Sequence, residues 1–204
     1  MQGHILEDII FTLDRNIKRL DDLLKLYENI SMGKGRKPAN TVDLLRATVI
    51  LTHATLEDFL RNVMIWKLPQ AKDSIISKIP LIGTQGGKFD LGELLRNREK
   101  TVEELIILSI RDYLNTKSFN NTNDICGTLD SINIPITDEM KTCFKLLDEM
   151  IQRRHHIVHQ ADRDDRQGRG YHGTKSLSYH TVIEWKRVVE KFVKEIIKSL
   201  QNEN

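Results

Sequence analysis

Apolar residues recur at steps of three and four along most of the chain, and this spacing is typical of one buried face of an α-helix. The first such stripe is made by Ile5, Ile9, Leu13, Ile17, Leu20, Leu24 and Tyr27. A second is made by Val42, Leu45, Val49, Leu56, Leu60 and Val63. A third joins Cys143, Leu147, Met150 and Ile151 to Val158 and Ala161, and a fourth is made by Val188, Phe192, Ile196 and Leu200. Because no segment alternates convincingly between apolar and polar residues, we expect an all-α fold, a helical bundle with up-and-down connections.

Threonines mark four of the expected helix starts, because a threonine hydroxyl can accept a hydrogen bond from a free amide of the first turn. They are Thr41, Thr101, Thr137 and Thr181. Thr101 and Thr181 each precede a glutamate by three residues, the spacing of a capping box. We expect helices over residues 5–30, 41–68, 101–115, 137–159 and 181–200. Glycine, proline and polar residues predict loops at 31–38 and 120–123, irregular structure with short helices over 69–100, and a basic loop over 160–177.

Length and composition limit the classes of protein that remain. The 204 residues suit a single domain over 1–204, and 39% hydrophobic with 29% charged residues excludes a disordered chain. No apolar run approaches the roughly 18 residues that cross a bilayer, and the first residues lack the pattern of a signal peptide. Because the two cysteines, Cys126 and Cys143, cannot form a framework of disulfides, we expect a cytoplasmic protein without a membrane partner.

Positive charge is concentrated in one segment, although the whole chain has a formal net charge of only +2. Residues 153–175 hold three acidic side chains against six basic ones: Arg153, Arg154, Arg163, Arg166, Arg169 and Lys175. The same segment holds four of the seven histidines: His155, His156, His159 and His172. Basic residues at a helix C-terminus complement the helix dipole. The dipole explains the arginines in part and the clustered histidines poorly.

The sequence Arg-Arg-His-His-Ile-Val-His at residues 153–159 is the strongest candidate for chemistry. Arg154 follows Met150 by four residues and so falls on the apolar stripe, where a charge needs an anion or a protein partner. His155 and His159 lie four residues apart and are neighbours on the adjacent face. Arginine offers paired planar donors to phosphate, and imidazole exchanges protons near neutral pH. The segment therefore suits phosphate-directed chemistry on RNA.

Two other interpretations of this segment remain open. His155 and His159 have the spacing of a zinc-binding pair, but the metalloprotease pattern needs glutamate where His156 stands, and no third ligand is evident. The histidines also suit a purely structural cluster at a helix end. We expect neither a metal ion nor another cofactor.

Glu57 lies four residues after His53 and four before Arg61 on the second expected helix. One hypothesis is an ordinary ion pair between Glu57 and Arg61. The other is a catalytic role in which Glu57 orients Arg154 across the bundle. His53 lies on an apolar face, so we expect it to be a buried, hydrogen-bonded histidine.

Arg154 and His159, with four residues between them and Gln-Ala-Asp-Arg after them, resemble the signature of the HEPN superfamily. Residues 13–28, 51–61 and 111–119 are similar to helices of its RiboL-PSP-HEPN branch. HEPN domains are all-helical, and many are metal-independent ribonucleases with an arginine and a histidine at this spacing. The chain departs from the pattern at His155, where catalytic members often have asparagine or aspartate.

The resemblance implies a symmetric homodimer whose two motif helices face each other across a basic cleft. Arg154 would hold the scissile phosphate, and His159 would transfer a proton as the RNA 2′-hydroxyl attacks the phosphorus. His155 would orient the phosphate or move the second proton. The side chains expected to bind RNA are Arg153, His156, Arg163, Arg166 and Arg169. DNA lacks the 2′-hydroxyl, so it would be bound but not cut.

Two classes of function follow from the resemblance. The first is an RNA endonuclease that acts as a prokaryotic toxin or an anti-phage defence effector, with an antitoxin or defence-system partner protein. The second is a non-catalytic HEPN module that binds RNA, a nucleotide or a protein through the same basic face. The presence of both Arg154 and His159 favours the enzyme.

Overall fold

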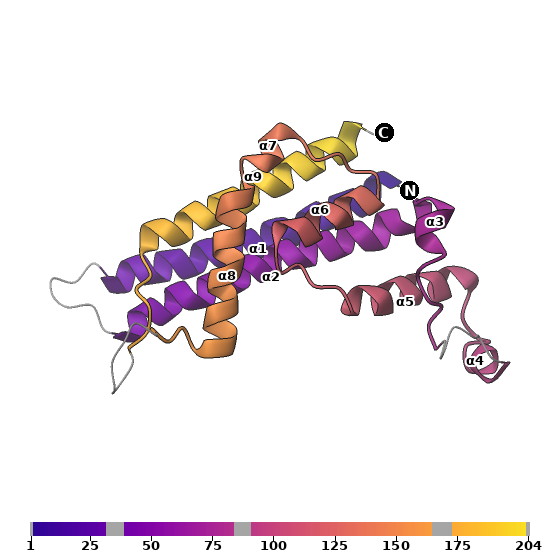
Figure 1. Ribbon diagram of the computed structural model, residues 1–204, viewed down its shortest axis with the longest axis horizontal. Helices are drawn as coiled ribbons and strands as arrows, with labels where there is room; N and C mark the ends of the chain where they lie inside the picture. The colour runs from indigo at the N-terminus through magenta and orange to yellow at the C-terminus, as the bar shows by residue number, and fades with distance from the viewer. Residues whose placement is uncertain (1, 32–38, 84–90, 165–172, 203–204) are drawn as a thin grey trace.

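Three long helices form the body of the molecule in the computed structural model, which describes residues 2–31, 39–83, 91–164 and 173–202. α1 (Gln2–Ser31) and α2 (Ala39–Lys67) run side by side in opposite directions, and α9 (Tyr179–Asn202) lies along them (Figure 1). α8 (Phe144–Gln160) crosses this layer and contacts both α2 and α9. Residues 158–161 are exposed, so the C-terminal end of α8 lies at the surface.

Shorter helical segments make up the other described elements. They are η1 (Leu68–Gln70), α3 (Asp73–Ile76), α4 (Leu91–Arg96), α5 (Val102–Asn115), α6 (Thr122–Ser131) and α7 (Asp138–Lys141). α5 contacts α2, and α6 contacts α8. Within the described ranges there is no strand, and one isolated β-bridge joins Arg163 to Thr174. The expected all-α fold is confirmed.

The apolar stripes of the helices meet in a continuous core. Leu45 of α2, Leu147 of α8 and Phe192 of α9 are each 0% exposed, so the crossing helix is anchored to the layer by fully buried contacts. Ile5, which we expected on the first stripe, is 44% exposed, and Leu6 is buried in its place. Successive helical residues point about 100° apart, so the buried face at the start of α1 is rotated by about this angle from the expected stripe.

Two of the four expected threonine caps are confirmed. Thr101 and Glu104 form a complete capping box, in which each side chain accepts a hydrogen bond from the other residue's backbone amide. The Thr137 hydroxyl accepts a hydrogen bond from the Met140 amide at the start of α7. Both helices therefore begin at a local signal that is complete within four residues.

The other two threonine caps are wrong. α2 begins at Ala39, so Thr41 lies within its first turn, where it is 2% exposed. α9 begins at Tyr179, and the Ser178 hydroxyl accepts the hydrogen bond from the Thr181 amide at 3.0 Å. In both cases the helix begins two residues before the threonine.

The helix expected over 137–159 is in fact two helices, with a break between α7 and α8 at residues 142–143. Met140 just before the break and Cys143 within it are both buried, so the apolar spacing gave no sign of the break. The loop expected at 120–123 is shorter, because α6 begins at Thr122 and Asn121 caps it. Much of the other expected loops, residues 32–38, 84–90 and 165–172, lies outside the described residues.

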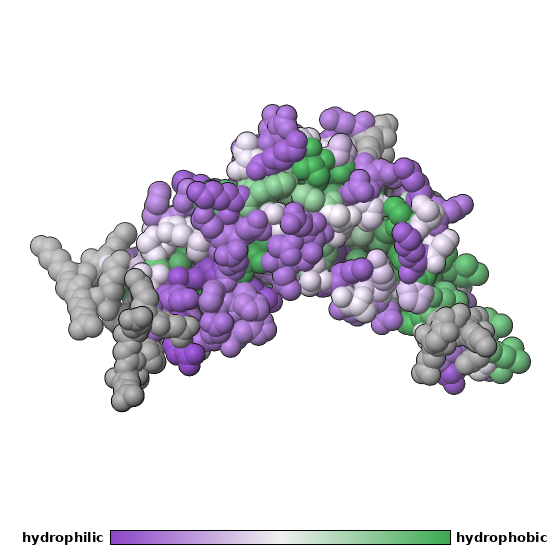
Figure 2. Space-filling view, in the orientation of Figure 1, coloured by the Kyte–Doolittle hydropathy of each residue, from purple (hydrophilic) through white to green (hydrophobic). Residues whose placement is uncertain are grey.

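The surface differs in polarity from one end of the molecule to the other (Figure 2). Hydrophilic side chains gather over α8 and its C-terminal end, whereas apolar side chains are exposed toward α4 and the start of α5. The exposed apolar residues at that end are Leu91, Leu94, Leu95 and Val102. No helix in the described part of the chain is both long enough and apolar enough to cross a membrane.

Candidate nucleic-acid-cleavage site

The histidines of the motif lie in the C-terminal half of α8, where this helix reaches the surface. Met150 and Ile151 are buried, whereas His155 and His159 are exposed on the same side of the helix. Their ring centroids lie 4.5 Å apart with the rings tilted by 43°. The expected continuation of the apolar stripe is wrong at Val158, which is 46% exposed, and at Ala161, which is also exposed. The last turn of α8 therefore extends beyond the core.

Arg154 lies at the boundary between the core and this exposed turn. Its side chain is half-buried, and its Nε atom is completely buried without a hydrogen-bonding partner. Across the described residues, Arg154 forms no hydrogen bond or ion pair. A cation held in this way has lost part of its hydration without gaining an acceptor, so it favours an anion from outside the chain.

His53 of α2 lies on the inner side of Arg154. It is 2% exposed, and its Nε2 atom lies 3.1 Å from the Phe119 carbonyl oxygen. Burial lowers the pKa of His53, and the positive charge of Arg154 lowers it further, although the Phe119 carbonyl and Glu57 act in the opposite direction. His53 is therefore a neutral, buried histidine at pH 7, as expected for its position on an apolar face.

Glu57 is paired with Arg61 on the same helix. Its Oε1 atom accepts hydrogen bonds from Arg61 Nε at 3.1 Å and Nη2 at 2.6 Å, and its Oε2 atom lies 3.7 Å from His53 Nδ1. Arg61 also donates to the carbonyl oxygens of Leu114, in the last turn of α5, and of Lys117, just beyond that helix. The ordinary ion pair is present, and among the described residues no hydrogen bond or ion pair joins Glu57 to Arg154.

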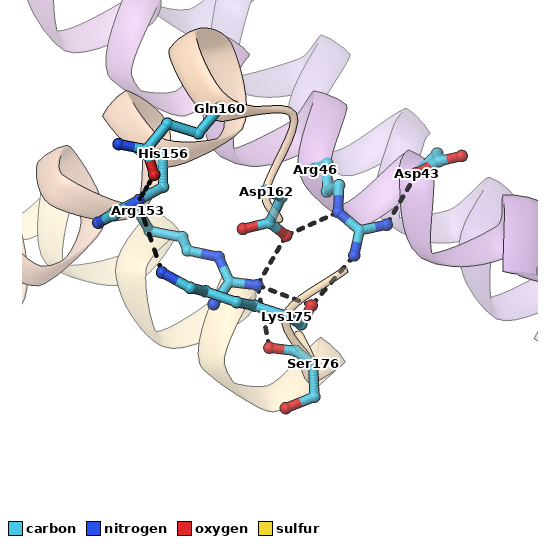
Figure 3. A network of polar contacts seen from close by, with 8 residues as sticks. All are labelled: Asp43, Arg46, Arg153, His156, Gln160, Asp162, Lys175 and Ser176. Atoms are coloured by element: carbon cyan, nitrogen blue, oxygen red, sulfur yellow. Dashed lines mark hydrogen bonds and ion pairs between the residues drawn. The ribbon is translucent and has the colours of Figure 1, made fainter. Parts of the chain in front are cut away.

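Arg153, which we expected to bind RNA, has internal partners (Figure 3). Its Nη2 atom donates to Asp162 Oδ2 at 2.8 Å and to the carbonyl oxygens of Lys175 and Ser176 at 3.0 Å each. Arg46 of α2 meets the same two groups, with Nε 2.8 Å from Asp162 Oδ2 and Nη2 3.1 Å from the Lys175 carbonyl oxygen. We call Arg46, Arg153 and Asp162 the arginine clamp.

Asp162, the carboxylate of the clamp, is 0% exposed. Arg46 Nη1 also donates to Asp43 Oδ1 at 2.8 Å. Burial opposes the charge of Arg46, but hydrogen bonds to Asp162 and Asp43 outweigh it, so the pKa of Arg46 is raised. Sequence reasoning did not find Arg46, and it included Asp162 only as an acidic residue among basic ones and as part of the Gln-Ala-Asp-Arg sequence after His159. No local pattern joins two residues that lie 116 positions apart.

The other residues expected to bind RNA lie near the clamp or beyond the described chain. His156 is half-buried, and its Nδ1 atom lies 2.8 Å from Gln160 Oε1 and 3.5 Å from Lys175 Nζ. Arg163 is exposed at the β-bridge to Thr174. Arg166 and Arg169 lie outside the described residues.

Chemically, the C-terminal half of α8 carries, within six residues, two exposed imidazoles and one arginine without an acceptor among the described residues. In the part of the chain that is described, no group of three or more histidine, cysteine, aspartate or glutamate side chains has an arrangement that could hold a metal ion. Arg154, His155 and His159 can bind an anion and exchange protons next to it.

Comparison with known proteins gives one match. The family model RiboL-PSP-HEPN matches residues 14–202 of the chain. This range includes α2, the motif on α8, the arginine clamp, all of α9 and more than half of α1. No curated protein and no solved structure matches the chain.

Proposed function

The chain belongs to the RiboL-PSP-HEPN family, and on that premise we propose that it is an endoribonuclease that cleaves RNA without a metal ion. The nucleophile is the 2′-hydroxyl of the RNA itself, and the residues that act on the phosphate are Arg154, His159 and His155. The protein works as a symmetric dimer in which two copies of the motif share one basic cleft.

The observation that carries the proposal is the state of Arg154. Its side chain is half-buried on the helix that also carries the exposed His155 and His159, and none of the described side chains or carbonyl groups accepts a hydrogen bond from it. Arg153, the preceding residue, differs in that its guanidinium donates hydrogen bonds to Asp162, Lys175 and Ser176. Arg154 is therefore suited to receive a phosphate.

The reaction uses groups that are within reach of this turn. The RNA 2′-oxygen attacks the adjacent phosphorus while the His159 imidazole takes its proton, and the bond from phosphorus to the 5′-oxygen breaks. His155 gives a proton to the leaving 5′-oxygen, and the products are a cyclic phosphate end and a 5′-hydroxyl end. Arg154 stabilises the charge that develops on the phosphoryl oxygens, and each of these effects is commonly worth a hundredfold or more.

Binding of the RNA backbone involves His156, Arg163, Arg166 and Arg169. Arg153 belongs to the same basic segment, but its Nη2 atom is already occupied by internal acceptors, so its contribution is to hold the segment in place. Glu57 has an indirect role in this proposal: its Oε2 atom lies 3.7 Å from Nδ1 of the buried His53, the ring whose pKa the charge of Arg154 lowers.

In the cell, such an activity suits a prokaryotic toxin or an anti-phage defence effector acting in the cytoplasm. Unrestrained RNA cleavage harms the host, so an antitoxin or a defence-system partner protein would control it. The alternative is a non-catalytic module that binds RNA, a nucleotide or a protein through the same face. Catalytic relatives commonly have asparagine or aspartate where this chain has His155. The experiment below therefore also tests the non-catalytic alternative.

The test is cleavage of labelled tRNA and mRNA by the purified protein in excess EDTA. We expect cleavage with a cyclic phosphate end, and we expect Arg154→Ala and His159→Ala each to lower the rate at least a hundredfold. Arg154→Lys should also be strongly impaired, because an ammonium group lacks the planar pair of donors. An RNA with a single 2′-deoxy nucleotide at the cut site should be bound but not cleaved.

Matched controls separate chemistry from folding. Arg111→Ala and His180→Ala replace exposed residues of the same types on α5 and α9, so they should retain wild-type rates. Cleavage that survives His159→Ala, or that needs a divalent ion, would contradict the mechanism. Binding of RNA without any cleavage by the wild-type protein would support the non-catalytic module.

A further inference from the structure

The arginine clamp joins the two ends of the segment between α8 and α9, at Asp162 and Lys175. We call these joined ends the base of the segment. Arg46 from α2 and Arg153 from α8 donate to the same carboxylate oxygen of Asp162 and to the same carbonyl oxygen of Lys175 (Figure 3). Two helices that are distant in sequence therefore hold both ends of one segment. Because each arginine bridges both acceptors, either end can move only if these hydrogen bonds break.

Backbone hydrogen bonds also join the two ends at this base. The Lys175 amide donates to the Asp162 carbonyl oxygen at 2.8 Å, and the Asp164 amide donates to the Gly173 carbonyl oxygen at 2.8 Å. This pairing surrounds the β-bridge between Arg163 and Thr174. The described residues on both sides of 165–172 are thus fixed to the body of the molecule.

The end of α8 adopts an unfavourable backbone conformation that brings Asp162 into the clamp. Ala161 and Asp162 have φ angles of 48° and 55°, in the left-handed region that residues with a side chain seldom enter in succession. The Asp162 amide donates to the His156 carbonyl oxygen at 3.1 Å, so the turn closes on the last turn of the helix. Strained backbone of this kind persists where surrounding contacts over-determine it, and it gathers at functional sites.

Stability alone is a poor explanation for the clamp. Burying a carboxylate and two guanidinium groups costs hydration that their mutual attraction often fails to exceed, and apolar side chains of similar size commonly do as well. Asp162 in addition leaves its Oδ1 atom buried without a partner among the described residues. The buried charge of Asp162 and the left-handed backbone of Ala161 and Asp162 are both unfavourable, and they lie two and three residues after His159.

We propose that Asp162, held by Arg46 and Arg153, is a positioning residue that fixes the last turn of α8 and thereby the imidazole of His159 for RNA cleavage. This inference rests on the proposed function. Asp162 acts through the backbone and does not touch the RNA. Arg46 links the site to α2, so a residue on another helix contributes to the placement of the histidine.

The test compares Asp162→Asn with Asp43→Asn in the full chain. Both substitutions remove a carboxylate that accepts a 2.8 Å hydrogen bond from Arg46, but Asp43 is exposed and lies outside the base of the segment. We expect Asp162→Asn to lower kcat at least tenfold with little change in KM, and to shift the NMR signals of the His159 ring. Asp43→Asn should keep the wild-type kcat and the His159 signals.

A readout without RNA separates this inference from the proposed function. Hydrogen exchange of the amides at 156–164 and 173–176 should become faster in Asp162→Asn and not in Asp43→Asn. If the wild-type protein cuts no RNA but this difference is found, positioning of His159 stands and the nuclease proposal fails. If RNA is cut and Asp162→Asn keeps the wild-type kcat, exchange and His159 signals, the inference is overturned and the nuclease proposal stands.

Two further variants cover failure to fold and a purely electrostatic effect. Where Asp162→Asn does not fold, Arg46→Lys decides, because it keeps the charge but cannot bridge both acceptors. A tenfold lower kcat supports the clamp, and an unchanged kcat overturns it.

Arg153→Gln should lower kcat and leave the salt dependence of RNA binding unchanged, whereas Arg163→Gln should reduce that salt slope by about one. The same reduced slope in Arg153→Gln would show a phosphate contact and overturn its place in the clamp.

Discussion

Arg153 and Arg154 carry the same charge on successive residues, but the structure gives them different surroundings. Arg153 donates to a buried carboxylate and two carbonyl oxygens, whereas Arg154 finds no acceptor in the described residues. Successive helical residues point about 100° apart, so the guanidinium of Arg153 reaches the returning chain at Lys175 and Ser176, whereas that of Arg154 points in a different direction. The first holds the segment, and the second is available to a phosphate.

His53 provides a test of the electrostatics beside Arg154. Its pKa in the folded protein is lowered, while the unfolded value is about 6.5. Below that pH the unfolded chain binds a proton that the folded protein refuses, so stability falls as the pH falls from 7 toward 5. In His53→Gln, a neutral replacement, this part of the pH dependence should disappear.

Urea unfolding at pH 7 and pH 5 measures the effect of that substitution. The wild-type protein should lose more free energy of unfolding over this interval than His53→Gln does. His180→Gln, on an exposed residue, should keep the wild-type pH dependence. An equal loss in the wild-type protein and in His53→Gln would show that His53 titrates normally in the folded state.

At the level of single residues, the sequence predicted positions better than partners. Residue types and spacing indicated that Arg154 is confined, that His159 is available and that His53 is buried. The partner of His53 is a carbonyl group 66 positions away, and that of Arg46 lies 116 positions away. Such pairs depend on how the helices cross, which the period of one helix does not determine.

Among the elements, helix starts were predicted where the capping signal is local and missed where it is not. Thr101→Ala removes a complete capping box and should lower the free energy of unfolding by about 1 kcal/mol. Thr41 is no cap, and its Oγ1 atom is buried without a partner among the described residues. Thr41→Val should therefore leave stability within about 0.5 kcal/mol of the wild type or raise it, because a buried unpaired hydroxyl is unfavourable.

Chemical denaturation of the two variants side by side checks these cap assignments. The two threonines are equivalent by sequence pattern, so the comparison tests the structure rather than the propensity of threonine. A loss of about 1 kcal/mol in Thr41→Val and none in Thr101→Ala would reverse the assignment of the caps.

The end of α8 gives a second prediction at the scale of the element. Ala161 has a φ angle of 48°, where glycine is favoured by roughly 1 kcal/mol because it has no Cβ atom. Ala161→Gly should therefore raise the midpoint of thermal unfolding. Asn133→Gly, at a φ angle of 60°, should raise it less, because asparagine tolerates the left-handed region better than alanine. Equal shifts would mean that the end of α8 is not strained.

For the whole molecule, the helical class followed from periodicity, and the crossing of α8 over α2 and α9 did not. The break at 142–143 changes the direction of the chain without interrupting the buried positions, so no pattern of apolar residues marks it. That crossing places His155, Val158 and His159 at the surface together. In a two-fold assembly a surface patch meets its own copy, and a patch beside the axis brings identical residues close to one another.

The proposed dimer predicts that Val158, which is 46% exposed between the two histidines, is buried when two copies meet. Val158→Glu would place two like charges near the axis and should give monomers in sedimentation experiments at micromolar concentration, with loss of RNA cleavage. Phe11→Glu, at a residue that is 64% exposed on α1, should remain dimeric and active. A wild-type monomer with full activity would contradict the dimer.

Mixing two inactive variants tests whether the two copies share one cleft. A heterodimer of Arg154→Ala with His159→Ala retains one Arg154 and one His159, each on a different chain. If the phosphate lies between the two motif helices, these two side chains can act on it together, and the mixture should recover cleavage that neither variant shows alone. Mixing Arg154→Ala with the double variant Arg154→Ala/His159→Ala should recover none, because no Arg154 remains. Recovery in the first mixture alone requires a composite site, whereas recovery in neither, with heterodimers present, would place each complete site within one chain.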